Sequence, residues 1–420
     1  MSLGLYISVP FCRTKCSYCN FASDVFSKSA YENYVARLLE DIASSRQLAS
    51  DMGCAFEETA DSVYLGGGTP SILDASQLMR IFAAVRGHFA VTPDAEITIE
   101  CALGTLTPAL IETLLQCGVN RVSLGVQSFV DREAQAVGRL HKRSTVLEEI
   151  GRLREAGLHS INVDLIAGLP HQTAESWAFS VSETIATGVP HASVYMLEVD
   201  DDSRLGRELI AGGARYHAHF VPDDDATADF YQQACESLGA AGIAQYEISN
   251  FARIATRGGE LLSNESRHNL KYWMRQPYLG FGVDAHSMLP TDLQKDESQR
   301  AVRFATPDSL DAYMNRAPHT VTPVSAQAAI EESFFLGLRL NRGIDLDRLR
   351  KEFRAEFNPE TVVLWESAVQ RSVYEGLLEQ QGSILRLTDR GRLLSNEVFA
   401  RFLTEKTEET KVGTGHVNSR

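Results

Sequence analysis

Residues 5–19 are Leu5-Tyr6-Ile7-Ser8-Val9-Pro10-Phe11-Cys12-Arg13-Thr14-Lys15-Cys16-Ser17-Tyr18-Cys19, an apolar segment that leads into three cysteines spaced CxxxCxxC. Thiolates are soft ligands that suit zinc and iron–sulfur clusters, and a structural zinc site needs four ligands. Three thiolates on one loop can instead bind three irons of a cubane and leave its fourth iron open. The spacing therefore favours a [4Fe–4S] cluster held by Cys12, Cys16 and Cys19. A zinc knuckle and three unrelated buried thiols are the alternatives.

Outward from this loop, short β-rich segments alternate with helical patterns through the first half of the chain. The predicted strands are 5–9, 62–65, 96–100, 121–124, 160–165 and 192–197. The predicted helices lie near 30–49, 74–88, 107–117, 144–157 and 173–187, where apolar residues recur at intervals of three and four. This alternation predicts an α/β fold, in which right-handed crossovers curl six βα units into a partial (β/α)6 TIM-like barrel.

Residues suited to binding or chemistry follow five of these predicted strands. Cys12 follows the first, and the segment 66–70, Gly-Gly-Gly-Thr-Pro, follows the second. Glu100 ends the third strand, Gln127 follows the fourth, and Asp164 lies near the end of the fifth. Because the working residues of a parallel barrel lie in the loops after the carboxyl ends of its strands, we expect these residues to meet at one rim.

The second half of the chain has a different pattern. A helix is predicted over 226–241 and a strand over 245–248, and polar segments near 255–266 and 291–300 predict exposed loops. From about residue 324 the pattern is mainly helical, with a β-wing at 384–387. We therefore predict a core barrel over 1–240, an extension over 241–320, a small, mainly helical C-terminal domain over 321–405, and a disordered tail over 406–420.

The composition limits the classes of function. The 420 residues are 44% hydrophobic and 23% charged, as in an ordinary globular protein, and the formal net charge of −15 argues against a nucleic-acid partner. No segment approaches the ~20 consecutive apolar residues of a membrane span, and residues 1–9 lack the basic segment of a signal peptide. The seven cysteines do not suggest a disulfide framework. These features predict a cytoplasmic location.

The cysteine loop resembles that of the radical SAM (S-adenosylmethionine) superfamily, and the segment 65–70, LGGGTP, looks like the second motif of that superfamily. Over about 400 residues the chain is most similar to its HemN/HemW group. The stretches that carry this resemblance are 125–129 (GVQSF), 138–141 (GRLH), 164–170 (DLIAGLP), 246–251 (YEISNF), 268–273 (HNLKYW) and 278–282 (YLGFG). The resemblance implies a radical SAM barrel, a HemW-like extension over 241–320 and a HemN-type C-terminal domain over 321–405.

The resemblance also implies a set of residues around SAM, whose amino and carboxylate groups would chelate the open iron of the cluster. The matching residues are Tyr6, Gly67, Gly68, Thr69, Glu100, Gln127, Arg139 and Asp164. Arg139 would pair with the methionyl carboxylate, and Asp164 or Glu100 would accept from hydroxyl or amino groups. Taken singly, Glu100 could be a helix-capping acid, Arg139 a solvated charge and Asp164 a turn residue.

Two features distinguish the branches of this group. HemN-type coproporphyrinogen dehydrogenases have a fourth cysteine two positions after the third, where this chain has Phe21, as HemW-type haem chaperones do. The HNxxYW motif at 268–273 is also similar to HemW. This resemblance implies that His268 contacts haem or its iron, with Tyr272 and Trp273 stacking on the porphyrin or packing against the barrel.

Some positions depart from the pattern of the group. Ser8 stands where a histidine is usual, Ala102 and Leu103 where asparagine and proline are common, and Asp284 where glycine is usual. These changes leave the cluster ligands intact but alter residues expected near SAM and substrate.

The leading prediction is a haem chaperone that carries haem as cargo and transfers it to an unidentified acceptor protein. One alternative is an oxygen-independent coproporphyrinogen III dehydrogenase, and another is a radical SAM enzyme with a different substrate. No catalytic residue is assigned.

The cluster assignment predicts a simple analytical result. Anaerobic reconstitution should give about four irons and four sulfides per chain, with the brown absorption of a [4Fe–4S] centre. Cys16→Ala should abolish the cluster because it removes one of three thiolates, whereas the control Cys117→Ala should retain it. Iron and sulfide analysis with visible spectroscopy measures both. A stable zinc centre, or a cluster that survives Cys16→Ala, would contradict the assignment.

Overall fold

Six parallel strands in chain order form the centre of the computed structural model, which describes residues 1–257, 260–291, 299–353 and 359–403. The strands are β1 (Leu3–Val9), β2 (Thr59–Gly67), β3 (Ala90–Cys101), β4 (Arg121–Gln127), β5 (Ser160–Ala167) and β6 (His191–Met196). The helices between them are α1 (Lys28–Asp51), η1 (Pro70–Ile72), α2 (Ala75–His88), α3 (Pro108–Gln116), α4 (Asp131–Ala136), α5 (Arg143–Glu155) and α6 (Ala174–Thr187). The predicted α/β core of six parallel strands is confirmed.

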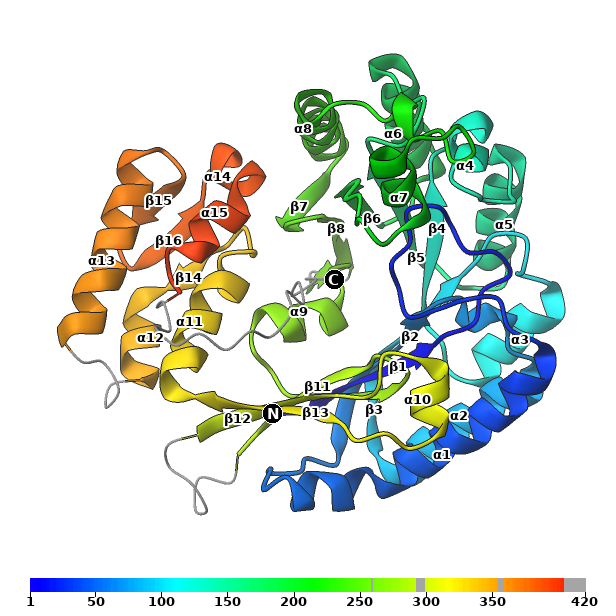
Figure 1. Ribbon diagram of the computed structural model, residues 1–420, viewed down its shortest axis with the longest axis horizontal. Helices are drawn as coiled ribbons and strands as arrows, with labels where there is room; N and C mark the ends of the chain where they lie inside the picture. Colours follow the sequence, from blue (N-terminus) through cyan, green and yellow to red (C-terminus); the bar gives the residue numbers. More distant parts are fainter. Residues whose placement is uncertain (258–259, 292–298, 354–358, 404–420) are drawn as a thin grey trace.

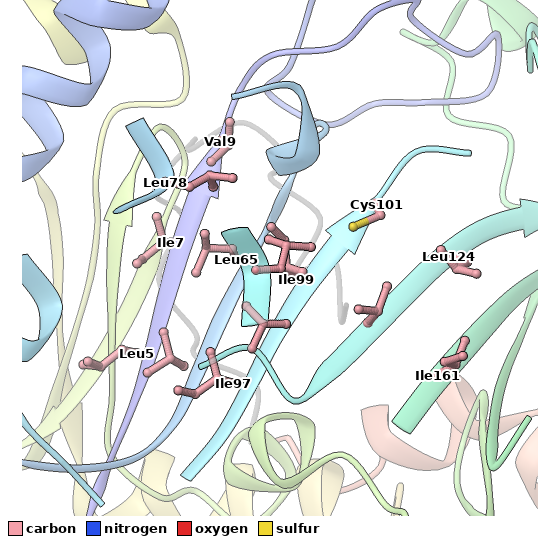
Figure 2. Close-up of a cluster of buried hydrophobic side chains, with 14 of the residues drawn as sticks. Leu5, Ile7, Val9, Leu65, Leu78, Ile97, Ile99, Cys101, Leu124 and Ile161 are labelled. Carbon is pink, nitrogen blue, oxygen red and sulfur yellow. The ribbon is translucent and has the colours of Figure 1, made fainter. Parts of the chain in front are cut away.

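In the parallel strands apolar side chains alternate with polar or small ones, as in β1, where Gly4, Tyr6 and Ser8 separate the apolar residues. In β1, Leu5, Ile7 and Val9 are fully buried. Figure 2 shows them beside apolar side chains of the neighbouring strands, among them Leu65 of β2 and Ile99 of β3. The helices form an outer layer around this sheet (Figure 1). Local signals fix their ends: at α2, the Asp74 carboxylate accepts from the Gln77 amide at 2.9 Å, and the Gln77 side chain accepts from the Asp74 amide at 3.1 Å.

Further strands extend both edges of this sheet, so that it contains 13 strands among the described residues. Beside β1 lie β10 (Tyr278–Gly282), β11 (His286–Pro290), β12 (Gln299–Ala305) and β13 (Thr320–Ser325). Beside β6 lie β8 (Asn250–Arg257), β7 (Ile243–Glu247) and β9 (Glu260–Ser263). The remaining elements of this half are α7 (Arg204–Ala211), η2 (Ala218–Phe220), α8 (Asp224–Ala240), α9 (Arg267–Trp273) and α10 (Leu310–Met314).

The prediction of an exposed loop over 255–266 was wrong. β8 and β9 pair antiparallel there, from Ile254 opposite Ser263 to Arg257 opposite Glu260. Local polarity suggested a loop, but β8 pairs with the edge that β6 offers, and β9 continues from β8. Of the other predicted loop, residues 292–298 lie outside the described residues, as does the predicted tail over 406–420.

The C-terminal region has its own apolar core. Its elements are α11 (Ala326–Gly337), β14 (Ile344–Asp345), α12 (Leu346–Glu352), α13 (Pro359–Tyr374), β15 (Leu378–Gln381), β16 (Ile384–Leu387), α14 (Asp389–Leu393) and α15 (Ser395–Ala400). The rings of Phe334 and Phe402 stack in this core with centroids 4.4 Å apart. The predicted helical C-terminal region is confirmed, and β16 occupies the position of the predicted wing. Figure 1 shows these helices, coloured yellow to red, grouped on one side of the sheet.

A buried carboxylate joins this region to the barrel. Glu332 of α11 accepts from Arg275 Nε at 2.8 Å and from Arg303 Nε at 2.7 Å. Burial alone would raise the pKa of Glu332, but Arg303 and Arg275 outweigh it and the pKa is lowered. Glu332 is therefore charged and ties α11 to β12 and to the end of α9. No helix among the described residues has the length and apolar character needed to cross a membrane.

Candidate metal and cofactor site

The register of the parallel strands brings the predicted rim residues onto neighbouring strand ends. Ser8 and Val9 of β1 lie opposite Gly66 and Gly67 of β2. Further along, Glu100 of β3 lies opposite Ser123 of β4, and Gly125 of β4 lies opposite Asp164 of β5. The candidate site is therefore built from backbone pairing between strands that are far apart in the sequence.

The cysteine loop leaves the carboxyl end of β1 and is anchored from several directions. Lys15 Nζ donates to the carbonyl oxygens of Phe21 at 3.0 Å and Ser23 at 2.7 Å. The Ser17 amide donates to the carbonyl of Val137, just after α4, at 3.2 Å, and the Ser17 carbonyl accepts from the amide of Leu205 in α7 at 2.8 Å. These bonds fix the backbone that carries the three thiols.

The three thiols differ in exposure. Cys16 is buried, whereas Cys12 and Cys19 are partly exposed. Burial raises the pKa of Cys12, and hydrogen bonds with Ser23 and Thr69 oppose the rise. Thr69 Oγ1 lies 3.9 Å from Cys12 Sγ. No three His, Cys, Asp or Glu side chains in the described part of the chain converge on a single metal ion. Thiolates that each bind a different iron of a cubane do not need to converge in that way.

The glycine loop lies directly against the cysteine loop. The Gly68 amide donates to the Val9 carbonyl at 2.7 Å. A Cβ at Gly68 would lie 2.7 Å from the Phe11 carbonyl oxygen, 2.9 Å from the Val9 carbonyl oxygen and 3.0 Å from Cys12 Sγ. Gly67 has φ = +100°, in the left-handed region that favours glycine. Only glycine allows this close approach, which leaves backbone polar groups beside the cysteines.

Arg139 and Gln127 have buried polar atoms without a protein partner, Nε and Oε1 respectively. Arg139 NH2 donates to the hydroxyl of Tyr18 at 3.0 Å, inside the cysteine loop. Burial opposes the charge of Arg139, but Tyr18 and Cys16 outweigh it, and its pKa is raised. Gln127 has φ = 68°, a strained left-handed conformation for a residue other than glycine. A buried cation with an unpaired donor, next to an unpaired acceptor, fits a ligand with an anionic and an amino group.

Glu100 and Asp164 lie in a hydrogen-bonded network next to this pair. Tyr64 OH donates to Glu100 Oε1 at 2.8 Å. Asp164 accepts from Ser123 Oγ at 3.0 Å and from Asn162 Nδ2 at 2.7 Å. Burial raises the pKa of Asp164, and its hydrogen bonds oppose the rise.

Sequence reasoning missed the residues that position this site, which are Tyr18, Tyr64, Ser123 and Asn162. Tyr18 lies between Cys16 and Cys19, so its place inside the cysteine motif could have identified it as a residue of the site. The strand residues carry no local signal, because only the register between strands brings them beside Glu100 and Asp164.

A small cavity of about 20 Å³ brings together two of the departures from the family pattern, Ser8 and Asp284, and Phe21, the residue that distinguishes the two branches. Tyr6, Gly67 and Gly68 also line it, together with Ala22 and Ser23. This volume holds about one water molecule. Asp284 has φ = 54°, which explains why glycine suits that position.

The structure places His268 beneath this rim, in the amino-terminal half of the strands, with the rings of Tyr6 and Tyr64 at centroid distances of 6.3 Å and 5.3 Å from its own. Its Nδ1 lies 3.0 Å from Ser62 Oγ, and its Nε2 lies 2.7 Å from Tyr272 OH. Ser62 precedes Gly67 by five residues of β2, which is roughly 16 Å of extended strand. His268 is 1% exposed, and burial, followed by the charge of Lys271, lowers its pKa to about 3. His268 is therefore neutral, and both ring nitrogens are engaged in hydrogen bonds.

The other two aromatic residues of the HNxxYW motif are also packed into the structure. Trp273 lies 4.3 Å beneath the guanidinium of Arg339, and the Tyr272 ring packs edge-on to Tyr278 with centroids 4.6 Å apart. In the described structure the motif packs α9 between the barrel and the C-terminal region.

Comparisons with known proteins agree with this architecture. Residues 6–181 match the radical SAM superfamily, and residues 324–394 match the HemN C-terminal domain. The haem chaperone HemW of Lactococcus lactis is 30% identical over 405 residues, covering 95% of this chain and 97% of that protein. HemW of Bacillus subtilis is 30% identical over 401 residues, covering 95% and 99%. The solved structure of the coproporphyrinogen III oxidase HemN from Escherichia coli matches with a TM-score of 0.78 at 22% identity, covering 96% of this chain and 90% of that one. The last similarity shows the fold alone.

The unpaired Nε of Arg139 leads to a prediction for SAM binding. Arg139→Ala should weaken SAM binding by ~1.5–3 kcal/mol, the value of a lost hydrogen bond to a charged group. Calorimetry on the reconstituted protein measures the dissociation constant. Arg143→Ala is the control, because Arg143 is a partly exposed arginine of α5 that pairs with Glu183. An unchanged constant for Arg139→Ala would exclude a contact between Arg139 and SAM.

The buried, neutral His268 predicts a pH dependence of stability. Its pKa is about 3 in the folded chain, against an ordinary value of 6.5, so only the unfolded chain takes up a proton between these values. The contribution of His268 to stability is complete above pH 6.5 and falls by about 1.4 kcal/mol for each pH unit below it. His268→Gln should remove that part of the slope of unfolding free energy, measured by urea unfolding between pH 7.5 and 5. The exposed-residue control His159→Gln should retain the slope. An unaltered slope in His268→Gln would mean that His268 is charged in the folded protein.

Proposed function

The chain belongs to the HemW family of radical SAM proteins, and from this relationship we propose that it is a haem chaperone, which binds haem as cargo and transfers it to an acceptor protein. The observation that carries the proposal is the near full-length similarity to the HemW haem chaperones of Lactococcus lactis and Bacillus subtilis. Both terminal regions are included in that similarity, so it extends beyond the barrel that radical SAM proteins share. We also place the chain in the cytoplasm, as its composition predicts.

Membership of the radical SAM superfamily brings a [4Fe–4S] cluster and SAM as cofactors. When bound, this pair supplies one-electron chemistry. In our assignment Cys12, Cys16 and Cys19 hold the cluster. The residues assigned to SAM are Tyr6, Gly67, Gly68, Thr69, Glu100, Gln127, Arg139 and Asp164.

The chain's own residues bind and orient these cofactors. Arg139 presents a fixed positive charge, and its bond to Tyr18 ties that charge to the cysteine loop. Gly67 and Gly68 expose backbone groups at the same place. Asp164 is held by Ser123 and Asn162, so its carboxylate has a fixed direction before any ligand binds.

The small cavity beside the cysteine loop supports the chaperone over the dehydrogenase. Phe21 replaces the extra cysteine of HemN-type enzymes with an apolar ring, and Ser8 replaces the usual histidine with a short hydroxyl. Both side chains line a space for about one water, with no imidazole or additional thiol among its lining residues. The extra cysteine of the enzyme branch and the histidine that is usual in the whole group are therefore both absent from this one place, and the cysteine is the one that distinguishes the branches.

The proposed haem contact of His268 requires a rearrangement. Its Nε2 is hydrogen-bonded to Tyr272, so an iron bond would require Tyr272 to move away first. In the described structure His268 positions Tyr272 and Ser62.

The test is a haem titration run beside an enzyme assay. Anaerobically reconstituted protein should bind haem, measured from difference spectra in the Soret region. With cluster, SAM and a reductant present, it should not convert coproporphyrinogen III to protoporphyrinogen IX, whereas a HemN-type enzyme assayed in parallel should. Phe21→Cys should remain inactive because Ser8, Ala102 and Leu103 are unchanged. Steady protoporphyrinogen formation by the wild-type chain would overturn the chaperone proposal in favour of the dehydrogenase. Failure of both assays would favour an enzyme with a different substrate.

A further inference from the structure

A buried arginine lies at the junction between the barrel and the C-terminal region. Arg339 follows the end of α11 and is 9% exposed. Its Nε is buried without a hydrogen-bond partner, and within the described part of the chain its guanidinium donates no hydrogen bond and forms no ion pair. Buried charges in native proteins are almost always paired. An unpaired cation in this position therefore indicates a site for an anionic group.

The backbone around Arg339 is fixed to β7 and to the turn after it. The Ile248 amide donates to the Arg339 carbonyl at 3.0 Å, and the Asn341 amide donates to the Tyr246 carbonyl at 2.9 Å. These partners belong to the stretch 246–251 (YEISNF), one of those that carry the family resemblance. The place of the guanidinium is thus set by the barrel before any ligand binds.

The guanidinium of Arg339 lies over the last residue of the HNxxYW motif. Its central carbon is 4.3 Å from the centre of the Trp273 ring, and Trp273 is itself buried at the end of α9. The face of an indole attracts a cation, and this contact uses none of the guanidinium N–H groups. They remain available to a carboxylate, which a guanidinium can bind through two parallel hydrogen bonds.

The nearby carboxylate of Glu247 neutralises Arg339 only in part. Glu247 is fully buried, and burial raises its pKa to about 7, while Arg339 and Asn250 oppose the rise. One of its oxygens, Oε1, accepts from Asn250, whereas Oε2 has no partner. Near neutral pH a carboxyl group with this pKa is charged in only part of the molecules. Arginine keeps its charge even when it is buried, so a net positive charge remains for a further anion.

Arg339 also borders the carboxyl-end rim of the barrel. Tyr195 near the end of β6 and Glu198 just after it are close enough to interact with the charge of Arg339. Tyr195 is exposed, and it interacts as well with Asp164 and Glu100, two of the residues assigned to SAM. A ligand at Arg339 would therefore lie next to the cofactor site, on the side of the C-terminal region.

A propionate of haem is the anionic group that suits this position best. The carboxylate of SAM is already assigned to Arg139. A chain with a net charge of −15 repels anions in general, so an anionic cargo needs a specific cation. At the same junction Arg275 and Arg303 are both bound to Glu332 and offer no free charge. Arg339 has no such partner, and it contacts the motif that the family resemblance links to haem.

We propose that Arg339 binds a propionate of the haem cargo, at the junction where the C-terminal region meets the HNxxYW motif and β6. The inference rests on the proposed function, because haem is the cargo only of a chaperone. It gives the C-terminal region a direct part in holding the cargo, since Arg339 comes from the end of α11 and Trp273 from α9. It leaves the iron free to be bound from α9.

The first test compares two ligands on the cluster-loaded, full-length wild type. Haem and haem dimethyl ester have the same ring and iron, but the ester lacks both propionate charges. The wild type should bind haem at least about tenfold more tightly than the ester, because a hydrogen bond to a charged group is lost. Titrations followed in the Soret region measure both dissociation constants. Equal affinities for the two ligands would overturn the inference.

The second test repeats this comparison on variants of Arg339. Arg339→Gln should bind haem about tenfold more weakly and the ester almost as the wild type does, so that the preference for haem disappears. Arg339→Lys keeps a positive charge beside Glu247 and should retain part of the preference, and it serves as the test if Arg339→Gln does not fold. The control Arg348→Gln changes an exposed arginine of α12 and should behave as the wild type. Urea unfolding and iron content show which variants are folded.

The outcomes separate this inference from the proposed function. If the wild type binds haem and Arg339→Gln keeps both the affinity and the preference, Arg339 does not bind a propionate and the chaperone proposal stands. If Arg339→Gln weakens haem and its ester equally, Arg339 acts through packing and the inference is also overturned. If the wild type binds neither ligand, the proposed function fails and the inference fails with it.

Discussion

The parallel pairing of β1 with β2 is the constraint on which the candidate site depends. Its register sets Ser8 opposite Gly66 and Val9 opposite Gly67, so the cysteine loop and the glycine loop leave the sheet together. The contact is so close that a side chain at Gly68 would meet the backbone of Phe11 and Val9 and the sulfur of Cys12. β1 also pairs with β10 on its other side, which brings Asp284 to the same place. A one-residue slip of β1 would reverse every side chain of the strand and separate these groups.

At this rim, Arg139 Nε and Gln127 Oε1 are buried away from water without a hydrogen-bond partner in the protein. A buried donor or acceptor without a partner is costly, and native proteins keep few of them. Arg139 and Gln127 both retain one, and Gln127 also has a strained backbone. The bond from Arg139 to Tyr18 couples this region to the cysteine loop, so a ligand at Arg139 and a cluster on the thiols would stabilise the same arrangement.

The two histidine sites illustrate opposite uses of the same side chain. His268 is sealed in the amino-terminal half of the barrel, neutral and bonded through both nitrogens, and it contributes to packing. His171 and His217 instead line an open hollow beside α4, together with Phe220. Burial and bonding, rather than residue type, decide which imidazole is available to a ligand.

The sequence by itself determined the features that depend on local chemistry and periodicity. CxxxCxxC, the glycine segment and the alternation of apolar patterns were sufficient to predict the three cysteines as cluster ligands, the six βα units and the residues of the rim, because each signal lies within one turn, strand or helix. The strand β9 was missed because its pairing depends on β8, which in turn pairs with the edge of β6. The partners of Glu100 and Asp164 and the closed environment of His268 were decided only by the tertiary structure. Each of them joins residues separated by tens to hundreds of positions, and long-range register and packing have no local signature in an amino-acid sequence.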